Sequence, residues 1–509
     1  MFSAALVAAG IGLVPGVAQA DPVPGGGRAV SAPDSAAAAD FAIALSSTGD
    51  TAHGITLTTA LSSGAGAQHV SVDWGDGSTD VVQDVVGGEL KSAHVYKKSG
   101  PYTVKVSAED TAGSRAAAEL KVVTRGSDFT PLAPTRLLDT RGGVGAPVAK
   151  VQAYKSAVLK IAGNSRFPAG VTAVALNVTV TNTTAGGHVT VSPGMNEPRP
   201  ATSNLNYEAG QSVPNMVIVP VGADGTVQIH NGGWQAVDLI ADVTGYFTRT
   251  SASGYTSLAP ARFVDTRSGI GTAQGRLRGY GSIETRMAGR EGIPAGATAV
   301  ALNLTVTNPE NFGHLTVYPS GGEAPTTSNL NFNPGQTVAN SVIVPVGTDG
   351  KIKILNGGWT PADVIVDVVG YYSPAGEAAY MPVTPYRALD TRDPDSTIGK
   401  VTARDYLHLP FGGGASGVEA YVLNTTVTNT TGDGFLSVAP DPNSMGDYKR
   451  KTAVVPPRPV SSTLNWTTGR TVPNLVQASA GEHGVVDFWN QSFGDVDLIV
   501  DYFGYYESK

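Results

Sequence analysis

The stretch "TRLLDTRGGVGAP" (residues 135–147) occurs in three versions, and its recurrence decides the fold. It returns as "ARFVDTRSGIGTA" at 261–273 and as "YRALDTRDPDSTIG" at 386–399. The shared aspartates are Asp139, Asp265 and Asp390, so the steps are 126 residues (139 to 265) and 125 residues (265 to 390). Solenoid repeats run about 20–50 residues. A period this long therefore indicates a duplicated domain.

Other landmarks keep the same spacing. The segment "ALNVTVTN" recurs as "ALNLTVTN" and "VLNTTVTN", and the copies close with "DLIADVTGYF", "DVIVDVVGYY" and "DLIVDYFGYY". We therefore predict three homologous domains, repeat 1 (129–250), repeat 2 (255–374) and repeat 3 (380–509).

The pattern inside each copy is that of β-strands. In repeat 1, apolar residues alternate with small or polar ones: Val174, Leu176, Val178 and Val180 against Ala173, Ala175, Asn177 and Thr179. Such alternation predicts a strand with one buried face and one solvated face. Gly-containing turn signals ("ADG", "TDG" and "NGG") separate the strands. We predict an all-β protein whose repeats are β-sandwich or jelly-roll-like domains.

The repeated motif places charged residues among apolar ones. A buried Asp or Arg is costly unless it is paired, and each copy has two aspartates four residues apart in its closing strand. We predict a structural ion clamp that joins the first segment of each copy to its last strand, with either arginine pairing with either aspartate. The clamp residues are Arg136, Asp139, Arg141, Asp238 and Asp242; Arg262, Asp265, Arg267, Asp363 and Asp367; and Arg387, Asp390, Arg392, Asp497 and Asp501. The alternative is a ligand site, since Arg binds carboxylates and Asp binds sugar hydroxyls.

A different unit precedes the repeats, over 41–125. It contains "VSVDWGDGSTD" and "AHVYKKSGPYTVKVSAEDTAG". These residues resemble the PKD domain, which implies an immunoglobulin-like β-sandwich acting as a spacer or binding module. Asp73 and Asp76 are calcium candidates, although carboxylates in a Gly turn more often accept backbone hydrogen bonds. We expect a structural role for His94.

The repeats themselves resemble the "LDTR" repeats of secreted actinobacterial proteins, on the motif quoted first. That resemblance implies an extracellular accessory module and carries no assigned chemistry.

Composition narrows the function. The chain of 509 residues has no cysteine, which excludes disulfides, thiolate metal sites and Cys nucleophiles. A formal net charge of −8 gives no basic field for nucleic acid or an anionic membrane.

Residues 1–20 end in Ala18-Gln19-Ala20 and have the pattern of a signal peptide, followed by a linker at 21–40. The segment lacks a positive n-region, which fits a start codon further upstream. No later apolar run is long enough to span a membrane, so we expect a secreted or loosely surface-associated protein.

Candidate ligand contacts are the aromatic turn tips. These are Trp234, Trp359 and Phe493, with the turn asparagines Asn231, Asn356 and Asn490. An aromatic ring on a hairpin tip can stack on a sugar. The favoured alternative folds it back as a lid over the sandwich end, since Trp is usually largely buried. The basic cluster Lys449-Arg450-Lys451 lies in an insertion of repeat 3 and reads as a solvated loop, or else as a contact for an acidic polymer.

Catalysis finds no support in the motifs. The sequence has no GxSxG, HExxH or P-loop pattern, and its eight histidines are scattered. His188 and His314 are equivalent, but Phe435 replaces them in repeat 3. We predict a non-catalytic adhesion protein without a cofactor, multivalent for cell-wall or environmental polysaccharide. A surface spacer that assembles with other surface proteins is the first alternative, and the accessory region of a polysaccharide hydrolase is the second.

Overall fold

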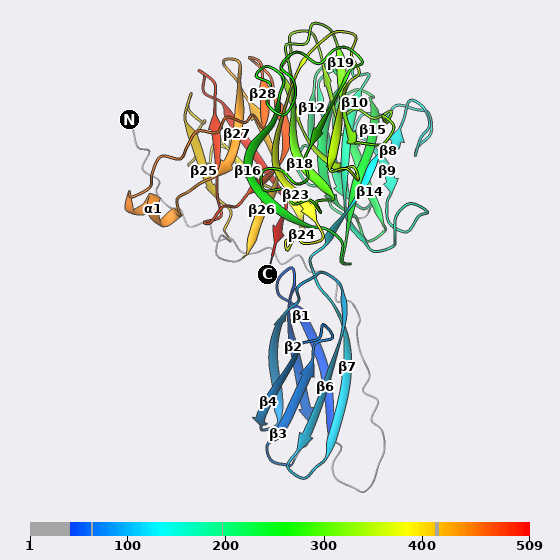
Figure 1. Cartoon of the computed structure of the whole chain (residues 1–509), viewed down its shortest axis with the longest axis vertical. Coiled ribbons are helices and arrows are strands. Elements are labelled where there is room, and N and C mark those ends of the chain that lie inside the picture. The colour runs from blue at the N-terminus through cyan, green and yellow to red at the C-terminus, as the bar shows by residue number, and fades with distance from the viewer. Residues whose placement is uncertain (1–40, 63–64, 196, 413–416, 509) are drawn as a thin grey trace.

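The computed structural model describes residues 41–62, 65–195, 197–412 and 417–508 (Figure 1). The predicted signal peptide (1–20) and linker (21–40) lie outside the described residues. The described part contains eight antiparallel sheets and one short helix, α1 (Met445–Arg450). The predicted all-β class is confirmed.

The N-terminal unit is a two-sheet sandwich. Its strands are β1 (Ala42–Gly49), β2 (Gly54–Ser62), β3 (Gln68–Asp73), β4 (Thr79–Val85), β5 (Gly88–Val95), β6 (Pro101–Asp110) and β7 (Arg115–Val123). A three-stranded sheet, β1-β2-β5, faces a four-stranded sheet, β4-β3-β6-β7. The alternating Val104 and Val106 of β6 point inward and join the fully buried Trp74 in one apolar core.

Each repeat is also a pair of four-stranded sheets. Repeat 1 consists of β8 (Asp128–Asp139), β9 (Ser156–Lys160), β10 (Val171–Thr181), β11 (Gly187–Pro193), β12 (Leu205–Tyr207), β13 (Val213–Pro220), β14 (Thr226–Asn231) and β15 (Asp238–Thr248). The inner sheet has the order β13-β10-β15-β8 and the outer sheet β12-β11-β14-β9. The first and last strands of the repeat therefore lie side by side.

Repeats 2 and 3 follow the same plan. Repeat 2 consists of β16 (Gly254–Asp265), β17 (Ser282–Arg286), β18 (Ala299–Thr307), β19 (Gly313–Pro319), β20 (Leu330–Phe332), β21 (Val338–Pro345), β22 (Lys351–Asn356) and β23 (Asp363–Ser373). Repeat 3 consists of β24 (Ala379–Asp390), β25 (Tyr406–Pro410), β26 (Val418–Thr428), β27 (Gly434–Pro440), β28 (Leu464–Trp466), β29 (Val472–Ser479), β30 (Val485–Asn490) and β31 (Asp497–Glu507), with α1 between β27 and β28.

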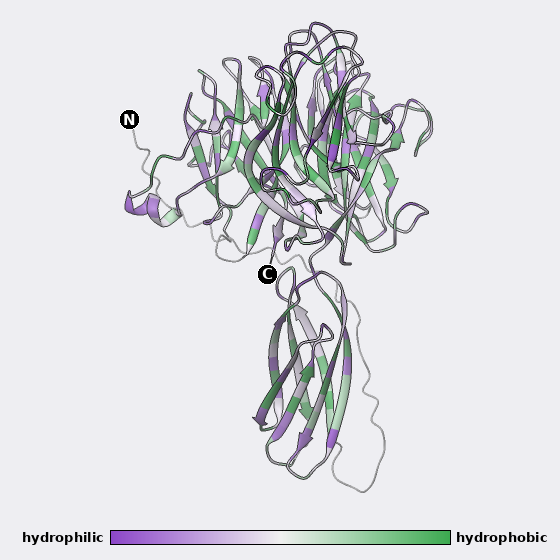
Figure 2. Cartoon of the chain, in the orientation of Figure 1, coloured by the Kyte–Doolittle hydropathy of each residue, from purple (hydrophilic) through white to green (hydrophobic). Residues whose placement is uncertain are grey.

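Each repeat has an apolar core between its two sheets, and Val174, Leu176, Val178 and Val180 belong to that of repeat 1. Figure 2 shows hydrophobic and hydrophilic residues alternating along many of the strands. The opposite face of β10 is not solvated as expected from its small and polar residues: Ala173, Ala175, Asn177 and Thr179 are all buried. The reason is that the inner sheets pack against one another.

A shared apolar core lies where the three inner sheets meet. It takes Phe129, Ala175 and Phe247 from repeat 1, together with Ala301 and Tyr372 from repeat 2 and their counterparts in repeat 3. Small residues on this face let the sheets approach closely. The repeats therefore form one unit around a central pseudo-threefold axis.

Asparagines continue the contact along the axis, in cyclic order. The Nδ2 of Asn340 donates to Asn177 Oδ1, that of Asn474 to Asn303 Oδ1 and that of Asn215 to Asn424 Oδ1, each at 3.0 Å. Each bond joins a different pair of repeats, so all three interfaces carry the same buried polar link.

The N-terminal sandwich attaches at one end of this unit (Figure 1). Gly126 N donates to Ala52 O at 2.8 Å, and Ala52 N donates to Glu507 Oε2 at 2.7 Å. Strand β15 ends beside Asp128, close to this junction, and begins at Asp238, at the other end of the unit. The turns near Asp238 and its counterparts therefore form a face directed away from the N-terminal sandwich, the distal face.

Candidate functional site

The repeated motif lies at the edge of each inner sheet. Arg136 Nε is 2.9 Å from Asp242 Oδ1, and its Nη1 is 3.0 Å from Asp139 Oδ2. Arg141 Nη2 is 2.7 Å from the same Asp139 oxygen. The motif thus joins β8 to β15 through Arg136. The other copies match, with Arg262–Asp367 and Arg387–Asp501 at 2.9 Å, Arg262–Asp265 and Arg387–Asp390 at 3.2 Å, and Arg267–Asp265 and Arg392–Asp390 at 2.7 Å.

The two carboxylates differ in environment. Hydrogen bonds from Arg141 lower the pKa of Asp139 to about 2, whereas burial raises the pKa of Asp242 despite its contact with Arg136. The cluster holds two arginines and two aspartates, and it offers no large excess of positive charge to an anion.

The other closing-strand aspartate has different partners from those predicted. Asp238 accepts hydrogen bonds from Thr140 Oγ1 at 2.7 Å and from Asn182 Nδ2 at 2.8 Å, and not from Arg136 or Arg141. Asp363 and Asp497 are bonded in the same way, to Thr266 with Asn308 and to Thr391 with Asn429. The sequence analysis missed two partners of Asp238: Thr140 of the motif and Asn182, which ends the segment "ALNVTVTN". Both residues recur in all three copies, and that recurrence could have identified them.

The aromatic tips stand in solvent on the distal face. Trp234 is 76% exposed and Trp359 is 72% exposed, so the lid interpretation is wrong for both. Each packs edge-on against a tyrosine, Tyr154 at 5.5 Å and Tyr280 at 5.3 Å between ring centroids. The edge-on tyrosine covers only part of each ring, and the rest of the ring faces solvent. In repeat 3, Phe493 is 89% exposed and lies under Arg404.

The tyrosines adopt an unfavourable backbone conformation. Tyr154 has φ of 59° and Tyr280 has φ of 55°, and Arg404 occupies the equivalent position with φ of 60°. A left-handed conformation costs a residue with a side chain roughly 1–2 kcal/mol, and Gly or Asn adopts it more readily. Strained residues cluster at ligand sites. Since Arg404 shares this conformation, the strain belongs to the turn in all three copies, and in repeats 1 and 2 the turn carries an exposed tyrosine beside the tip tryptophan.

The turn asparagines hold the tips in shape from within. Asn231 is buried, its Nδ2 donates to the carbonyls of Val151, Gln152 and Gln235, and its Oδ1 accepts from Gly233 N. Asn356 and Asn490 are equally buried and bonded. These three residues, predicted as ligand contacts, have their polar atoms engaged inside the turn, because the chain reversal leaves backbone carbonyls that need donors.

Histidines and glycines distinguish repeats 1 and 2 from repeat 3. A Cβ added to Gly232 would lie 2.2 Å from the His188 ring, and one on Gly357 would lie 2.2 Å from the His314 ring. Burial lowers the pKa of both histidines. In repeat 3 the histidine becomes Phe435 and the glycine becomes Gln491, so both members of the pair change together.

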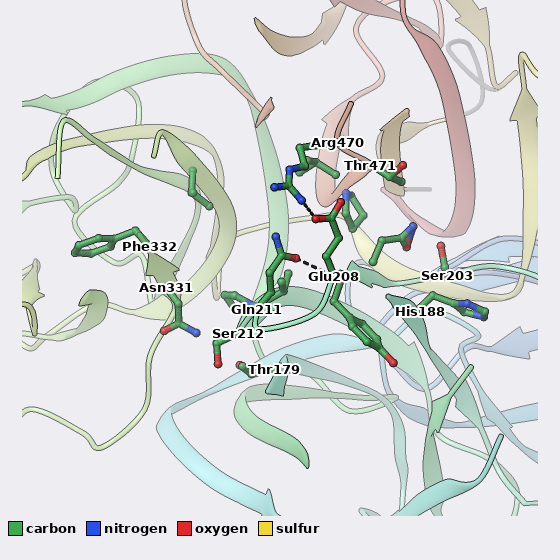
Figure 3. A pocket seen from close by; sticks show the side chains of 18 of the residues that line it. Thr179, His188, Ser203, Glu208, Gln211, Ser212, Asn331, Phe332, Arg470 and Thr471 are labelled. Carbon is green, nitrogen blue, oxygen red and sulfur yellow. Dashed lines mark hydrogen bonds and ion pairs between the residues drawn. The ribbon is translucent and has the colours of Figure 1, made fainter. Parts of the chain in front are cut away.

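A cavity of about 1580 Å³ opens between the repeats. Figure 3 shows Asn331 and Phe332 of repeat 2 on one side of Glu208, and His188 of repeat 1 on the other. Glu208 forms an ion pair with Arg470 of repeat 3. The lining combines Asn, Thr, Ser and Gln side chains with six arginines, three histidines, Glu208 and several aromatic rings, so it offers hydrogen-bond donors and acceptors to hydroxyl-rich ligands.

The calcium candidates satisfy the backbone of their own turn. Asp73 Oδ1 accepts from Gly75 N at 2.9 Å, and Asp76 accepts from Ser78 N at 3.0 Å and contacts His94 Nε2 at 2.9 Å. Among the residues that the structure describes, no group of three or more His, Asp or Glu side chains is arranged to hold a metal ion.

The insertion in repeat 3 covers its outer sheet. Tyr448 of α1 stacks on His408 with ring centroids 3.7 Å apart and donates to Asp441 Oδ2. Arg450 of the basic cluster bonds Asp447 at 2.9 Å. Beneath the insertion, Asp487 is fully buried, and burial together with the adjacent Asp441 raises its pKa to about 9.

No helix within the described ranges is both long and apolar enough to cross a bilayer. No protein-family model matches the chain, and no curated protein does.

Several solved structures resemble the chain over much of its length. The tetra-tandem repeat in the extending region of a large adhesion protein is 12% identical, covering 91% of this chain and 96% of its own, with a TM-score of 0.16. SGBP-B of a Bacteroides ovatus mixed-linkage glucan utilization locus, in complex with a mixed-linkage heptasaccharide, is 12% identical, covering 88% of this chain and 92% of its own, with a TM-score of 0.14. Carbohydrate-binding modules of the β-sandwich superfamily are 14% identical over 41% and 95%, with a TM-score of 0.15. At these TM-scores we base no functional inference on the likenesses.

Proposed function

We propose that this chain is a secreted, non-catalytic adhesion protein that binds an uncharged polysaccharide through the distal face of its three-repeat unit. The observation that carries the proposal is the pair of exposed tips, Trp234 with Tyr154 and Trp359 with Tyr280. A large exposed ring is unusual on a protein surface, and each of these tips presents two such rings side by side.

The chemistry of the face favours a neutral sugar. Stacking of a pyranose on Trp or Tyr buries its apolar C–H face, and the Asn, Thr and Gln side chains of the cavity supply donors and acceptors for hydroxyl groups. The motif arginines and Arg470 of the cavity are already paired with carboxylates, and Arg199 contacts His230. The chain as a whole has a net charge of −8, which repels an acidic polymer.

The remaining parts of the chain fit an accessory role. We propose that residues 41–125 form a PKD-like spacer and that 129–250, 255–374 and 380–509 are LDTR-type repeats, on the sequence motifs given above. The N-terminal sandwich, at the opposite end from the distal face, would hold that face away from whatever precedes it. Export rests on the signal pattern of residues 1–20.

Retention on insoluble polysaccharides tests the proposal. We expect the full chain to sediment with chitin, cellulose or peptidoglycan, and the Trp234→Ala/Trp359→Ala variant to be released. Each stacked ring contributes roughly 1 kcal/mol or more, so the double variant should lose about tenfold to a hundredfold in apparent affinity. Matched controls remove exposed apolar residues away from the tips, with Val86→Ala (77% exposed) in the sandwich and Val455→Ala (82% exposed) in the insertion.

Three results would contradict this function. If the chain binds none of the three polymers, the spacer alternative is favoured. Equal losses in the Val86→Ala control would indicate non-specific adsorption. Release of reducing sugar from any polymer would favour the hydrolase alternative.

A further inference from the structure

The cavity extends from the distal mouth into two of the three interfaces between repeats. Groove A lies between repeats 1 and 2 and is lined by Arg136 and Ile240 on one side and by His314, Thr326 and Trp359 on the other. Arg136 Nη2 donates to Thr326 O at 3.3 Å across its floor.

Groove B is the equivalent place between repeats 3 and 1. It is lined by Arg387 and Ile499 of repeat 3 and by His188, Ser203 and Tyr154 of repeat 1. Asn424 Nδ2 donates to Ser203 O at 2.8 Å, as Asn177 Nδ2 donates to Ser328 O at 2.7 Å in groove A. Each groove therefore combines the motif edge of one repeat with the histidine and aromatic tip of its neighbour.

The third interface, between repeats 2 and 3, differs at the same positions. Arg262, Arg267 and Phe493 do not line the cavity. Gln491, which replaces the glycine of the other two copies, is 7% exposed and donates to Pro459 O at 3.1 Å. Gln491 holds the sequence position of the glycines whose added Cβ would meet the histidine ring, and Phe435 holds that of the histidine.

The inserted segment of repeat 3 adds to this closure. The connection from Pro440 to Leu464 has 23 residues, against 11 between Pro193 and Leu205 in repeat 1. Arg458 at its end donates to Arg404 O at 2.7 Å and lies over Trp489, with its guanidinium 5.4 Å from the ring centroid. The tip of repeat 3 is thus tied to the chain's own insertion.

We propose that the chain has two composite carbohydrate sites, grooves A and B, and that the third interface is closed by Phe435, Gln491 and the repeat 3 insertion. This rests on the proposed function and deepens it: the tandem copies give two sites and not three, and each site needs two adjacent repeats. The occupant is an uncharged pyranose chain, whose apolar C–H faces stack on the tip ring while its hydroxyls reach the Asn, Thr and His side chains.

The number of bound oligosaccharides tests the proposal on the full chain. Chitohexaose and cellohexaose serve as separate probes, which distinguishes an N-acetylated chain from a plain glucan. Native mass spectrometry and calorimetric titration should give two equivalents of the preferred probe. Trp359→Ala removes the ring of groove A, and Tyr154→Asn removes that of groove B with a residue that accepts the left-handed conformation. Each variant should bind one equivalent, and the two together none.

Phe493→Ala is the matched control, because this tip is 89% exposed and belongs to the closed interface. It should still bind two equivalents. Three equivalents for the natural chain, or a loss in Phe493→Ala, would overturn the two-site inference and leave the proposed function standing. If neither hexasaccharide binds and no insoluble polymer retains the chain, both fail. If a polymer retains the Trp359→Ala/Tyr154→Asn variant as well as the natural chain, the grooves are not the sites.

Discussion

Replacing Arg136 with leucine tests how strongly the first strand of a repeat is held to its last. The Arg136 side chain is 21% exposed, and its partner Asp242 is 2% exposed. Removing one member of a buried pair leaves an uncompensated charge and costs about 3–5 kcal/mol. Since Arg136 is partly exposed and the carboxyl can accept a proton, we expect a loss of about 3 kcal/mol at pH 8. Arg141→Leu is the control, because its partly exposed side chain contributes only about 0–1 kcal/mol.

The pH dependence identifies the mechanism. Burial already raises the pKa of Asp242, and loss of Arg136 raises it further. A raised folded-state pKa means that the variant gives up stability as the pH rises from the unfolded-state value, near 3.9, toward the folded-state value. The loss of unfolding free energy in Arg136→Leu, relative to the natural chain, should therefore be smallest near pH 4 and grow toward pH 8. Chemical denaturation of the full chain, followed by circular dichroism, measures it. Arg136→Leu/Asp242→Leu should recover most of the loss. A deficit that is independent of pH, or no recovery, would refute the buried-charge explanation.

Three other substitutions probe separate parts of the chain. Asp487→Asn should stabilise repeat 3 by a few kcal/mol at pH 8 and little at pH 4, because the folded-state pKa of about 9 makes the natural residue lose stability between those values; equal effects at both pH values would contradict the raised pKa. Tyr280→Asn should raise the unfolding free energy by about 1 kcal/mol in the same denaturation assay, since asparagine accepts the left-handed conformation; a destabilised variant would mean that the ring contributes to folding. Asn340→Ala should cost about 2–4 kcal/mol, as it leaves Asn177 Oδ1 and Met216 N without their partner, while Asn333→Ala in the exposed turn should be neutral; similar values for both would refute a role at the repeat interface.

Features that depend on local pattern were predictable from the sequence. The strands, the duplication and the contact between a motif arginine and a last-strand aspartate follow from alternation, spacing and the cost of burying charge. The choice of partner was not predictable: Asp238 and Asp242 are four residues apart and equivalent in pattern, and only the register places Arg136 opposite Asp242.

The exposure and the backbone conformation of the aromatic tips were not predictable from the sequence. The burial of Trp in most proteins favoured a lid, yet the exposure of Trp234 depends on what lies above the turn, which no local pattern records. The left-handed backbone of Tyr154 is likewise hidden, because the residue type argues against it. The burial of Asn231 and Asn356 was not predictable either. The pattern "NGG" marks a turn whether the asparagine side chain faces solvent or the interior.

The packing of the three repeats against one another explains a pattern that a single copy leaves ambiguous. An Ala-x-Ala-x-Asn-x-Thr stripe on a strand suits a solvated surface, but it also suits a sheet that must approach another sheet closely. Ala173 and Ala175 are fully buried in the shared core, where repeat 3 places Val422 at the position of Ala175. The asparagine of each stripe accepts a hydrogen bond from an asparagine of another repeat, and the three bonds close a cycle. The asparagines that form this cycle recur in every copy, whereas the tip region changes in one copy, at Phe435 and Gln491. Comparison among the repeats of one chain thus separates residues that hold the unit together from residues free to specialise.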